Sequence, residues 1–366
     1  MSTISATDVE VQKPVNVIFQ ETLLRNARAR APYFAGTQAG SLTEQRGSAT
    51  IKWRRYNTAL DDSSAIDLTT TALAELTGSA AYGQGRTADV VHFTDVTATV
   101  SKYGQYHILN EEVEIFNFNN TFDGIVTALG ISAGRSVNAL QRNIGEDNAT
   151  KVYANGVASD GAVVAVTSAA DIKRVINTLN RNSAITFSPM TMGSENIGTG
   201  PVLPSYWAIC HPDVAVDVSG LTGFKSVETY SGQVETVPFE FGYFGQAGQG
   251  VRFIQTEDAS IDADAGGTNS GTTRGTSDTD LYTILVYGMD AIGSVGLGQS
   301  YGTGVFETGD DVPAVQLIVS QRQASAADPF AELRTVAWKA WHTGAILNAN
   351  WARALRVGAT AQASFS

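Results

Sequence analysis

The stretch that decides the fold is residues 119–153, NNTFDGIVTALGISAGRSVNALQRNIGEDNATKVY. In this stretch residues recur at the spacing that places them on one face of a helix. Asn120 or Thr121 could cap the N-terminus of that helix, and Asp123 would sit favourably in its first turn. We predict a helix over about 120–146; some 25 residues at ~1.5 Å each would span roughly 37 Å. The glycines in this segment lower its intrinsic helix propensity, so we expect packing against the rest of the protein to stabilise the helix. One predicted face carries Ile125, Leu129, Ser132, Ser136 and Leu140.

Two alternating segments precede this helix, RGSATIKWRRYN at 46–57 and VVHFTDVTATVSKYGQYHIL at 90–109. Alternation is typical of strands, and residues 90–109 would be the returning strand or strands. Together with residues 49–56 they could form the two legs of one long hairpin. In the first leg, Ile51, Trp53 and Arg55 would share one face. Residues 57–89 between the legs are a long excursion rich in Thr, Ala, Ser, Asp and Gly, which favours a binding or assembly role.

The remaining pattern predicts an α+β fold whose strands lie far apart in the sequence. Residues 1–13 resemble a flexible arm, and a helix is expected from Pro14. A second helix is expected at 168–182 with Ser168 as its cap, and residues 262–280 should form an exposed low-complexity loop. Strands are predicted at 206–218 (ending at His211-Pro212, before a helical turn), 281–297 and 312–323, and from 335 onward.

Composition excludes several classes of function. The net charge is −12 and only 16% of residues are charged, against roughly 25% in an average domain. A negative field disfavours a nucleic-acid binder that uses its whole surface, and likewise an anionic membrane. Cys210 is the only cysteine, so an intrachain disulfide and a four-cysteine zinc site are excluded. Without a secretory signal or ~18 consecutive apolar residues, we expect a soluble protein folded in a cytoplasm.

Possible catalytic or metal motifs are weak, and we expect no enzyme, cofactor or metal site. GQSYG at 298–302 fits a nucleophile elbow, but no helical pattern follows it, so Ser300 is interpreted as a loop residue. Cys210 and His211 are adjacent on a strand and would point to opposite faces. The histidines at 92, 107, 211 and 342 lack metal spacing. Three aspartates resemble an incomplete calcium loop: Asp258, Asp262 and Asp264.

Three stretches in order, YWAICHPDVAVDV, LYTILVYGMDAIGSVGLG and ASAADPFAELRTVAWKAWHTGAILNANWARAL, resemble major capsid proteins of tailed bacteriophages. The resemblance extends back through RGSATIKWRRYNTAL, TALAELTG and VTATVSKYGQYHILNEEVE. It covers roughly residues 15–360, although 230–280 match little. Its signatures are Tyr103-Gly104, His211-Pro212-Asp213, Asp328-Pro329, and Trp338-Lys339 with Asn348 beyond.

The resemblance implies the tailed-phage major capsid fold, shared with herpesvirus capsid floors and encapsulins. Its parts would be an N-terminal arm at 1–45 and an extended loop with its base at 46–95. A peripheral domain with a long spine helix would comprise 96–151 and 301–366. An axial domain would comprise 152–300. A chain that leaves a domain and returns to it would explain the discontinuous strands.

The implied function is structural: self-assembly into hexamers and pentamers of an icosahedral head that encloses double-stranded DNA. The protein would be part of the virion and would assemble in the host bacterial cytoplasm. Only about 14 residues precede the first predicted helix, so we expect a separate scaffolding protein. A portal protein is a further expected partner, a decoration protein could be another, and DNA would be non-specific cargo. The alternatives are an encapsulin-like shell and a glycine-rich β-type tail or adhesin protein.

The base of the extended loop is the predicted subunit interface. Cations interleaved with aromatic rings, as in KWRRY, also fit a nucleic-acid groove, but the net charge argues against that interpretation. We expect the cations to meet acidic groups of a neighbouring subunit and Trp53 to anchor the hairpin leg on the peripheral domain. Arg54→Glu should then block shell assembly. The predicted interface residues are Lys52, Trp53, Arg54, Arg55, Tyr56 and Glu75.

Overall fold

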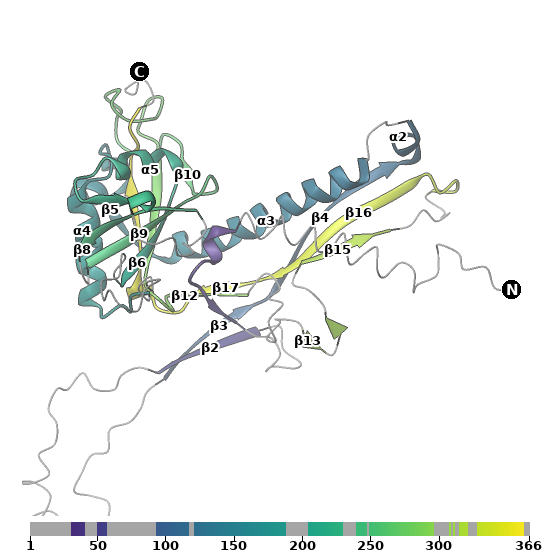
Figure 1. Ribbon diagram of the computed structural model, residues 1–366, viewed down its shortest axis with the longest axis horizontal. Helices are drawn as coiled ribbons and strands as arrows, with labels where there is room; N and C mark the ends of the chain where they lie inside the picture. Colours follow the sequence, from purple (N-terminus) through teal and green to yellow (C-terminus); the bar gives the residue numbers. More distant parts are fainter. Residues whose placement is uncertain are drawn as a thin grey trace, which may run out of the picture. The chain divides into compact units, whose positions relative to one another are not determined.

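The structure is a computed structural model (Figure 1). The residues that it describes are 31–40, 50–56, 93–116, 121–187, 204–229, 239–246, 249–295, 307–308, 310–311, 315–320 and 328–361. They divide into two units, Lys52–Thr97 and the remainder, each considered separately. The predicted helix from Pro14, the 57–89 excursion and the GQSYG motif lie outside the described ranges.

A long helix on a three-stranded sheet forms one part of the larger unit. The helix is α3 (Thr121–Asn148), which confirms the predicted helix. It runs along a sheet ordered β15 (Val315–Val319), β16 (Leu333–His342), β4 (Ser101–Asn110), in which both strand pairs are antiparallel (Figure 1). The buried side chains between the two layers are Leu109, Val126, Leu129, Ala133, Val137, Val315, Val336, Trp338 and Ala340.

The five residues predicted to share one face of α3 are not the buried stripe of the helix. Of these five residues only Leu129 is fully buried, and Ser136 is exposed. The observed stripe contains Val126, Ala133 and Val137, each next in sequence to a predicted position and therefore displaced around the helix by about 100°. Small residues on this stripe let the helix approach the sheet closely. A search of the sequence for large apolar residues at helical spacing therefore does not find the buried stripe.

An eight-stranded sheet forms the other part of the larger unit. The central strand β11 (Leu281–Tyr287) is buried along its whole length, because both faces of the sheet are covered. It pairs antiparallel with both of its neighbours in the order. The order is β5 (Thr150–Tyr153), β18 (Ala352–Val357), β11, β6 (Ser205–Cys210), β9 (Gln249–Gln255), β8 (Glu240–Gln246), β7 (Phe224–Ser226), with β10 (Ile261–Asp262) pairing with β11.

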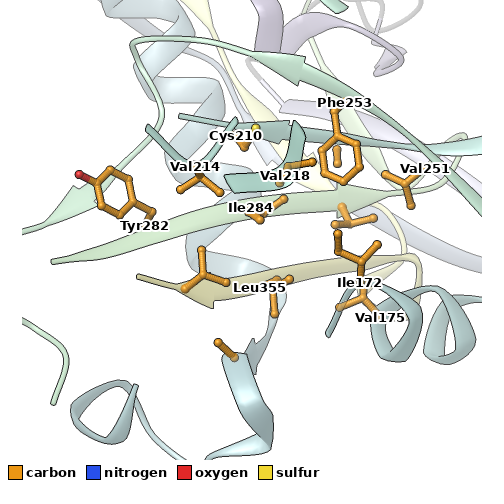
Figure 2. Close-up of a cluster of buried hydrophobic side chains, with 14 of the residues drawn as sticks. Ile172, Val175, Cys210, Val214, Val218, Val251, Phe253, Tyr282, Ile284 and Leu355 are labelled. Carbon is orange, nitrogen blue, oxygen red and sulfur yellow. The ribbon is translucent and has the colours of Figure 1, made fainter. Parts of the chain in front are cut away.

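Two helices cover one face of this sheet, α4 (Ala169–Arg181) and α5 (Pro212–Ser219). Figure 2 shows their side chains packed against the strands, from Ile172 and Val175 of α4 to Phe253 and Leu355. Ser168 caps α4 as predicted. Its hydroxyl accepts the backbone N–H of Asp171, and the Asp171 carboxylate accepts the N–H of Ser168.

The opposite face of the sheet is covered by the end of α3 and by residues 31–40. That segment contains η1 (Pro32–Phe34) and β1 (Gln38–Ala39), and β1 pairs in parallel with β12 (Ile292–Ser294). β12 also pairs antiparallel with β17 (Gly344–Ile346). The shared core contains Tyr33, Ala149, Ile209, Ile254, Leu285, Tyr287 and Ala354.

Two details of the chain path differ from the sequence-based predictions. Residues 90–109 do not form one hairpin leg, because β3 (Phe93–Thr99) pairs with β2 (Thr50–Tyr56) whereas β4 pairs with β16. The chain changes partner at Val100, which is buried. β18 lies in the large sheet, apart from the other C-terminal strands with which it was grouped. The division into peripheral and axial domains stays a prediction.

The remaining elements are short. The loop at 262–280 is mostly exposed, as predicted, but Thr273 and Thr279 are buried and hydrogen-bonded to each other. Asp264 accepts the backbone N–H groups of three loop residues and so fixes its conformation. The short elements are α2 (Glu111–Phe116), β13 (Glu307–Thr308), β14 (Asp310–Asp311), η3 (Ala154–Gly156), η4 (Asp160–Ala162), η5 (Val227–Thr229) and η6 (Ala349–Trp351).

Candidate assembly surfaces

The base of the predicted extended loop is a two-stranded sheet of β2 and β3. Along β2 the side chains alternate as predicted: Ile51 and Trp53 are buried, whereas Lys52 and Arg54 are exposed. Arg55 is half-buried. Tyr56 is the last residue of β2, and Glu75 lies outside the described residues.

Asp95 on β3 binds both exposed cations of β2. The Lys52 ammonium lies 2.5 Å from Asp95 Oδ2, and Arg54 donates two hydrogen bonds to the same carboxylate, of 2.8 and 3.2 Å. The Arg54 guanidinium also lies 4.2 Å from the centre of the Phe93 ring. Hydrogen bonds from Arg54 and Lys52 lower the pKa of Asp95 to about 2, so this carboxylate is charged at neutral pH.

The hairpin base therefore has internal partners for its cations, which the sequence analysis did not foresee. Two cations share one carboxylate, so this group of three keeps a net charge of +1 in a chain of net charge −12. The predicted contact with acidic groups of a neighbouring subunit would use this surplus positive charge, and that contact stays a prediction.

The three-stranded sheet has an outer face, the one opposite α3. Alternate residues of β16 face α3, so Thr335, Ala337, Lys339 and Trp341 lie on the outer face beside the β4 residues in register with them. Tyr106 and Ile108 of β4 are 65% and 56% exposed there, and Ile318 of β15 is 44% exposed. The Lys102 ammonium lies 4.6 Å from the centre of the Trp341 ring. The outer face is therefore both apolar and cationic.

Gly104 of the Tyr103-Gly104 signature allows β4 and β16 to pair closely. A Cβ atom at this position would lie 2.7 Å from the backbone oxygen of Trp338. The glycine is thus required by packing rather than by any chemistry.

The tip of the same sheet consists of α2 with the end of β4 and the turn 328–333. The backbone N–H of Glu111 donates to the Glu332 carbonyl at 2.9 Å and joins the two segments. Asp328 accepts the N–H groups of Glu332 and Leu333 at 3.1 and 2.9 Å, which explains the aspartate of the Asp328-Pro329 signature. Within this turn Phe330 is 82% exposed. Sequence reasoning missed Phe330, although its place next to that signature was a usable signal.

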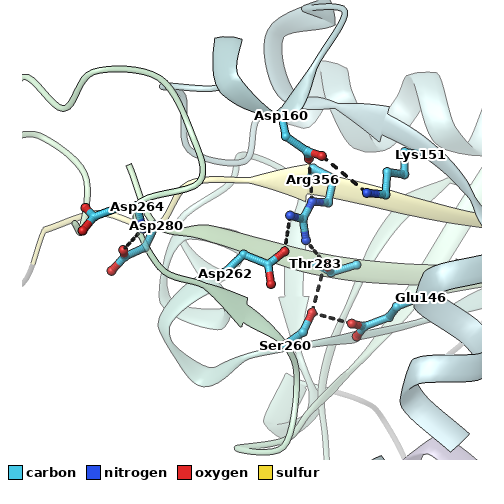
Figure 3. A network of polar contacts seen from close by, with 9 residues as sticks. All are labelled: Glu146, Lys151, Asp160, Ser260, Asp262, Asp264, Asp280, Thr283 and Arg356. Atoms are coloured by element: carbon cyan, nitrogen blue, oxygen red, sulfur yellow. Dashed lines mark hydrogen bonds and ion pairs between the residues drawn. The ribbon is translucent and has the colours of Figure 1, made fainter. Parts of the chain in front are cut away.

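A polar network joins α3, the N-terminal segment and the large sheet. Figure 3 shows the part of it that runs from Glu146 to Arg356. Glu146 of α3 is buried and accepts hydrogen bonds from Tyr33 Oη, at 2.8 Å, and from Ser260. Burial raises the pKa of Glu146, and the two hydroxyl donors counteract part of that effect. The Ser260 hydroxyl is also hydrogen-bonded to the Thr283 hydroxyl, with 3.1 Å between the two oxygens. Thr283 in turn accepts a hydrogen bond from the Arg356 guanidinium.

Arg356 is the centre of the rest of that network. Its guanidinium binds Asp160 at 2.9 Å, Thr283 at 2.7 Å, and Asp262. Asp160 also pairs with Lys151 of β5. These contacts tie β18 to β10, β11 and the segment that precedes α4, so the network positions elements and leaves no group converging on a ligand.

The groups that could have carried chemistry have structural roles. The Cys210 thiol is buried, which raises its pKa, and His211 caps α5 through Nδ1. The three aspartates at 258, 262 and 264 bind different partners: the first binds Arg135 and Asn138, the second Arg356, and the third backbone N–H groups. Across the described ranges, no three His, Cys, Asp or Glu side chains could hold a metal ion. None of the described helices is long and apolar enough to cross a membrane.

The fold and its exposed faces define a structural protein of the capsid type, with extended surfaces that other chains can contact. The family model described as phage capsid protein matches residues 94–357, and the chain belongs to this family. The fold is that of the major capsid proteins of tailed phages, as the resemblance implied.

Solved phage capsids share this fold at low sequence identity. The capsid of Ralstonia phage GP4 is 10% identical, with a TM-score of 0.57 over 90% of this chain and 88% of that one. The capsid of cyanophage Pam1 is 12% identical, with a TM-score of 0.51 over 89% of both chains. The head of Helicobacter pylori bacteriophage KHP40 is 11% identical, with a TM-score of 0.51 over 90% and 91%. No curated protein sequence matches the chain.

Proposed function

We propose that this protein assembles into the hexamers and pentamers of an icosahedral phage head that encloses double-stranded DNA. The observation that carries the proposal is the family match, which spans both the helix-backed sheet and the eight-stranded sheet. The solved relatives are described as capsids or heads, and this chain covers nearly their whole length.

Assembly would depend on many modest contacts rather than on one strong one. Rings of five or six copies use heterologous contacts that close by rotation. Each interface would bury on the order of 1,200–2,000 Å². A subunit held by several neighbours stays in place when one contact opens, so multivalency supplies the stability of the shell. The base of the extended loop, with its surplus positive charge at Lys52 and Arg54, would contact an adjacent subunit.

The proposed partners follow from the same assembly. A separate scaffolding protein would set the curvature, a portal protein would occupy one vertex, and a decoration protein could bind the finished shell. The packaged DNA would be cargo held without sequence recognition, because a chain of net charge −12 offers little attraction to phosphates. Assembly would take place in the host bacterial cytoplasm.

Electron microscopy of the purified protein tests the proposal. The expected result is closed shells or isolated hexamers and pentamers, whereas monodisperse monomers under all assembly conditions would contradict it. Nucleic-acid content separates two kinds of shell. Particles from infected cells should contain double-stranded DNA, and shells filled with an enzyme instead would indicate an encapsulin-like compartment.

A further inference from the structure

We propose that the tip of one copy binds the outer face of a second copy, with Phe330 as the apolar anchor and Glu332 opposite Lys339. This inference rests on the proposed function, because it requires copies that assemble. It assigns a contact to two exposed apolar surfaces of opposite charge.

The tip holds its aromatic anchor in solvent with a rigid turn. Asp328 accepts two backbone N–H groups of the turn, and the backbone N–H of Ala331 donates to the Asp328 carbonyl. Ala331 has a φ of +57°, a conformation that costs free energy in a residue with a Cβ atom. The turn is thus specified by several contacts, and its effect is to expose a phenylalanine. Exposed aromatic residues on rigid supports are typical binding hot spots.

More apolar surface lies around this anchor. Leu333 at the start of β16 is exposed, and so are Val113 and Ile115 of α2. The hydrogen bond from Glu111 to Glu332 keeps α2 beside the turn. The tip is therefore an apolar patch of several side chains, larger than the scattered exposed apolar residues normal for a monomer.

The charges of the two surfaces are complementary. By sequence the tip has five acidic residues, Glu111, Glu112, Glu114, Asp328 and Glu332, and Arg334 follows them on β16, which gives a net charge of −4. The outer face carries Lys102 and Lys339 beside Tyr106 and Trp341. Neither Glu332 nor Lys339 has an ion-pair partner within the described part of the chain, so both charges are available to another copy. A contact between two tips would instead bring like charges together.

The turn of the tip and the part of the outer face around Lys339 and Trp341 cannot meet within one molecule. Leu333 and Trp341 are eight residues apart on the extended strand β16, which places them roughly 26 Å from each other. A contact between unlike surfaces of separate copies is heterologous, and such contacts generate rings or continuing lattices rather than closed dimers. That is the type of contact a shell repeats.

Charge reversal with rescue tests the contact. The single variants Glu332→Lys and Lys339→Glu should each lower the yield of shells at least tenfold, measured by sedimentation and electron microscopy. The double variant should restore most of the yield, because the pair is re-formed with its charges exchanged. Phe330→Ala should also lower the yield at least tenfold, with an unchanged melting temperature for the unassembled chain. Lys173→Glu on α4 is the matched control for a charge change and should assemble normally.

The inference would be overturned by normal shells from Phe330→Ala, by normal shells from both single charge variants, or by a double variant that fails although it folds. If the single variants fail only when a scaffolding or decoration protein is present, the tip binds that protein and the second copy is excluded. Wild-type protein that forms no shells, hexamers or pentamers under any condition would instead contradict the proposed function itself.

Discussion

His342 is a buried histidine at the end of β16 that lacks hydrogen-bond partners in the described residues. Its ring packs edge-on against Phe34 with the centroids 5.5 Å apart, and both ring nitrogens are unpartnered. Burial lowers the pKa of His342 to about 4 from 6.5. The folded state therefore holds the neutral ring, and the unfolded chain takes up the proton first as the pH falls.

Stability should accordingly be lost as the pH falls from about 6.5 toward 4. The loss from His342 between pH 7 and pH 5 should be about 2 kcal/mol. His342→Leu should remove this acid-dependent part, which urea unfolding of the unassembled chain at both pH values would measure. His107→Gln, at an exposed position of β4, is the matched substitution of a second histidine for comparison. An identical pH dependence in His342→Leu and the wild type would contradict the assignment.

Arg356 illustrates a residue whose geometry matters more than its charge. Its planar guanidinium contacts Asp160, Asp262 and Thr283 at once, which a lysine ammonium cannot do from the same position. Arg356→Lys should cost roughly 2 kcal/mol of unfolding free energy. Arg353→Lys on the same strand should cost less, because among the described residues Arg353 donates to two backbone carbonyls, both through one nitrogen. If urea unfolding shows that the two variants lose the same free energy of unfolding, the contacts of Arg356 with Asp160, Asp262 and Thr283 add no stability of their own.

At the scale of elements, α3 contains two glycines in opposite situations. A Cβ atom at Gly124 would meet nothing within 4 Å, whereas one at Gly145 would lie 2.7 Å from a methyl of the buried Leu285. Gly124→Ala should stabilise the chain by about 0.5–1 kcal/mol through helix propensity. Gly145→Ala should destabilise it by about 1 kcal/mol, because overpacking exceeds that gain. Thermal unfolding of both variants compares them directly, and stabilisation by both would show that Leu285 has room to move.

Local patterns in the sequence predicted elements well, and contacts distant in sequence poorly. The α3 helix, the Ser168 cap and the alternation of β2 depend on residues within one or two turns of each other, so spacing alone reveals them. The buried face of α3 depends on how closely a sheet can approach small residues. The network of Glu146, Ser260 and Arg356 joins segments separated by some 100 residues, and no local pattern encodes it. The Asp328-Pro329 signature marked the position of Phe330 in the sequence, but the exposure of its ring is a property of the folded turn.

At the scale of the whole molecule, polar and apolar contacts cooperate to fix the N-terminal segment. Residues 31–40 hold α3 through Tyr33, which donates its backbone N–H to Asn138 and its hydroxyl to Glu146. They hold the sheets through a hydrogen bond from Tyr287 to the Ala35 carbonyl and through β1. A helix, a sheet and the segment 31–40 are thus linked around one buried carboxyl. The surfaces proposed for assembly lie elsewhere, at the tip, the outer face and the hairpin base, so changes there should alter assembly without unfolding the chain.

Arg54 provides the test of that separation between folding and assembly. Arg54→Glu places a second carboxylate beside Asp95 and reverses the surplus charge of the hairpin base from +1 to −1. A neighbouring acidic surface would then be repelled, and shells should not form. The side chain is exposed, so the melting temperature of the unassembled chain should change by no more than about 2 °C. Arg54→Gln keeps the pair between Lys52 and Asp95 and should give an intermediate yield of particles. Normal particles from Arg54→Glu would show that assembly does not use the surplus positive charge of the hairpin base.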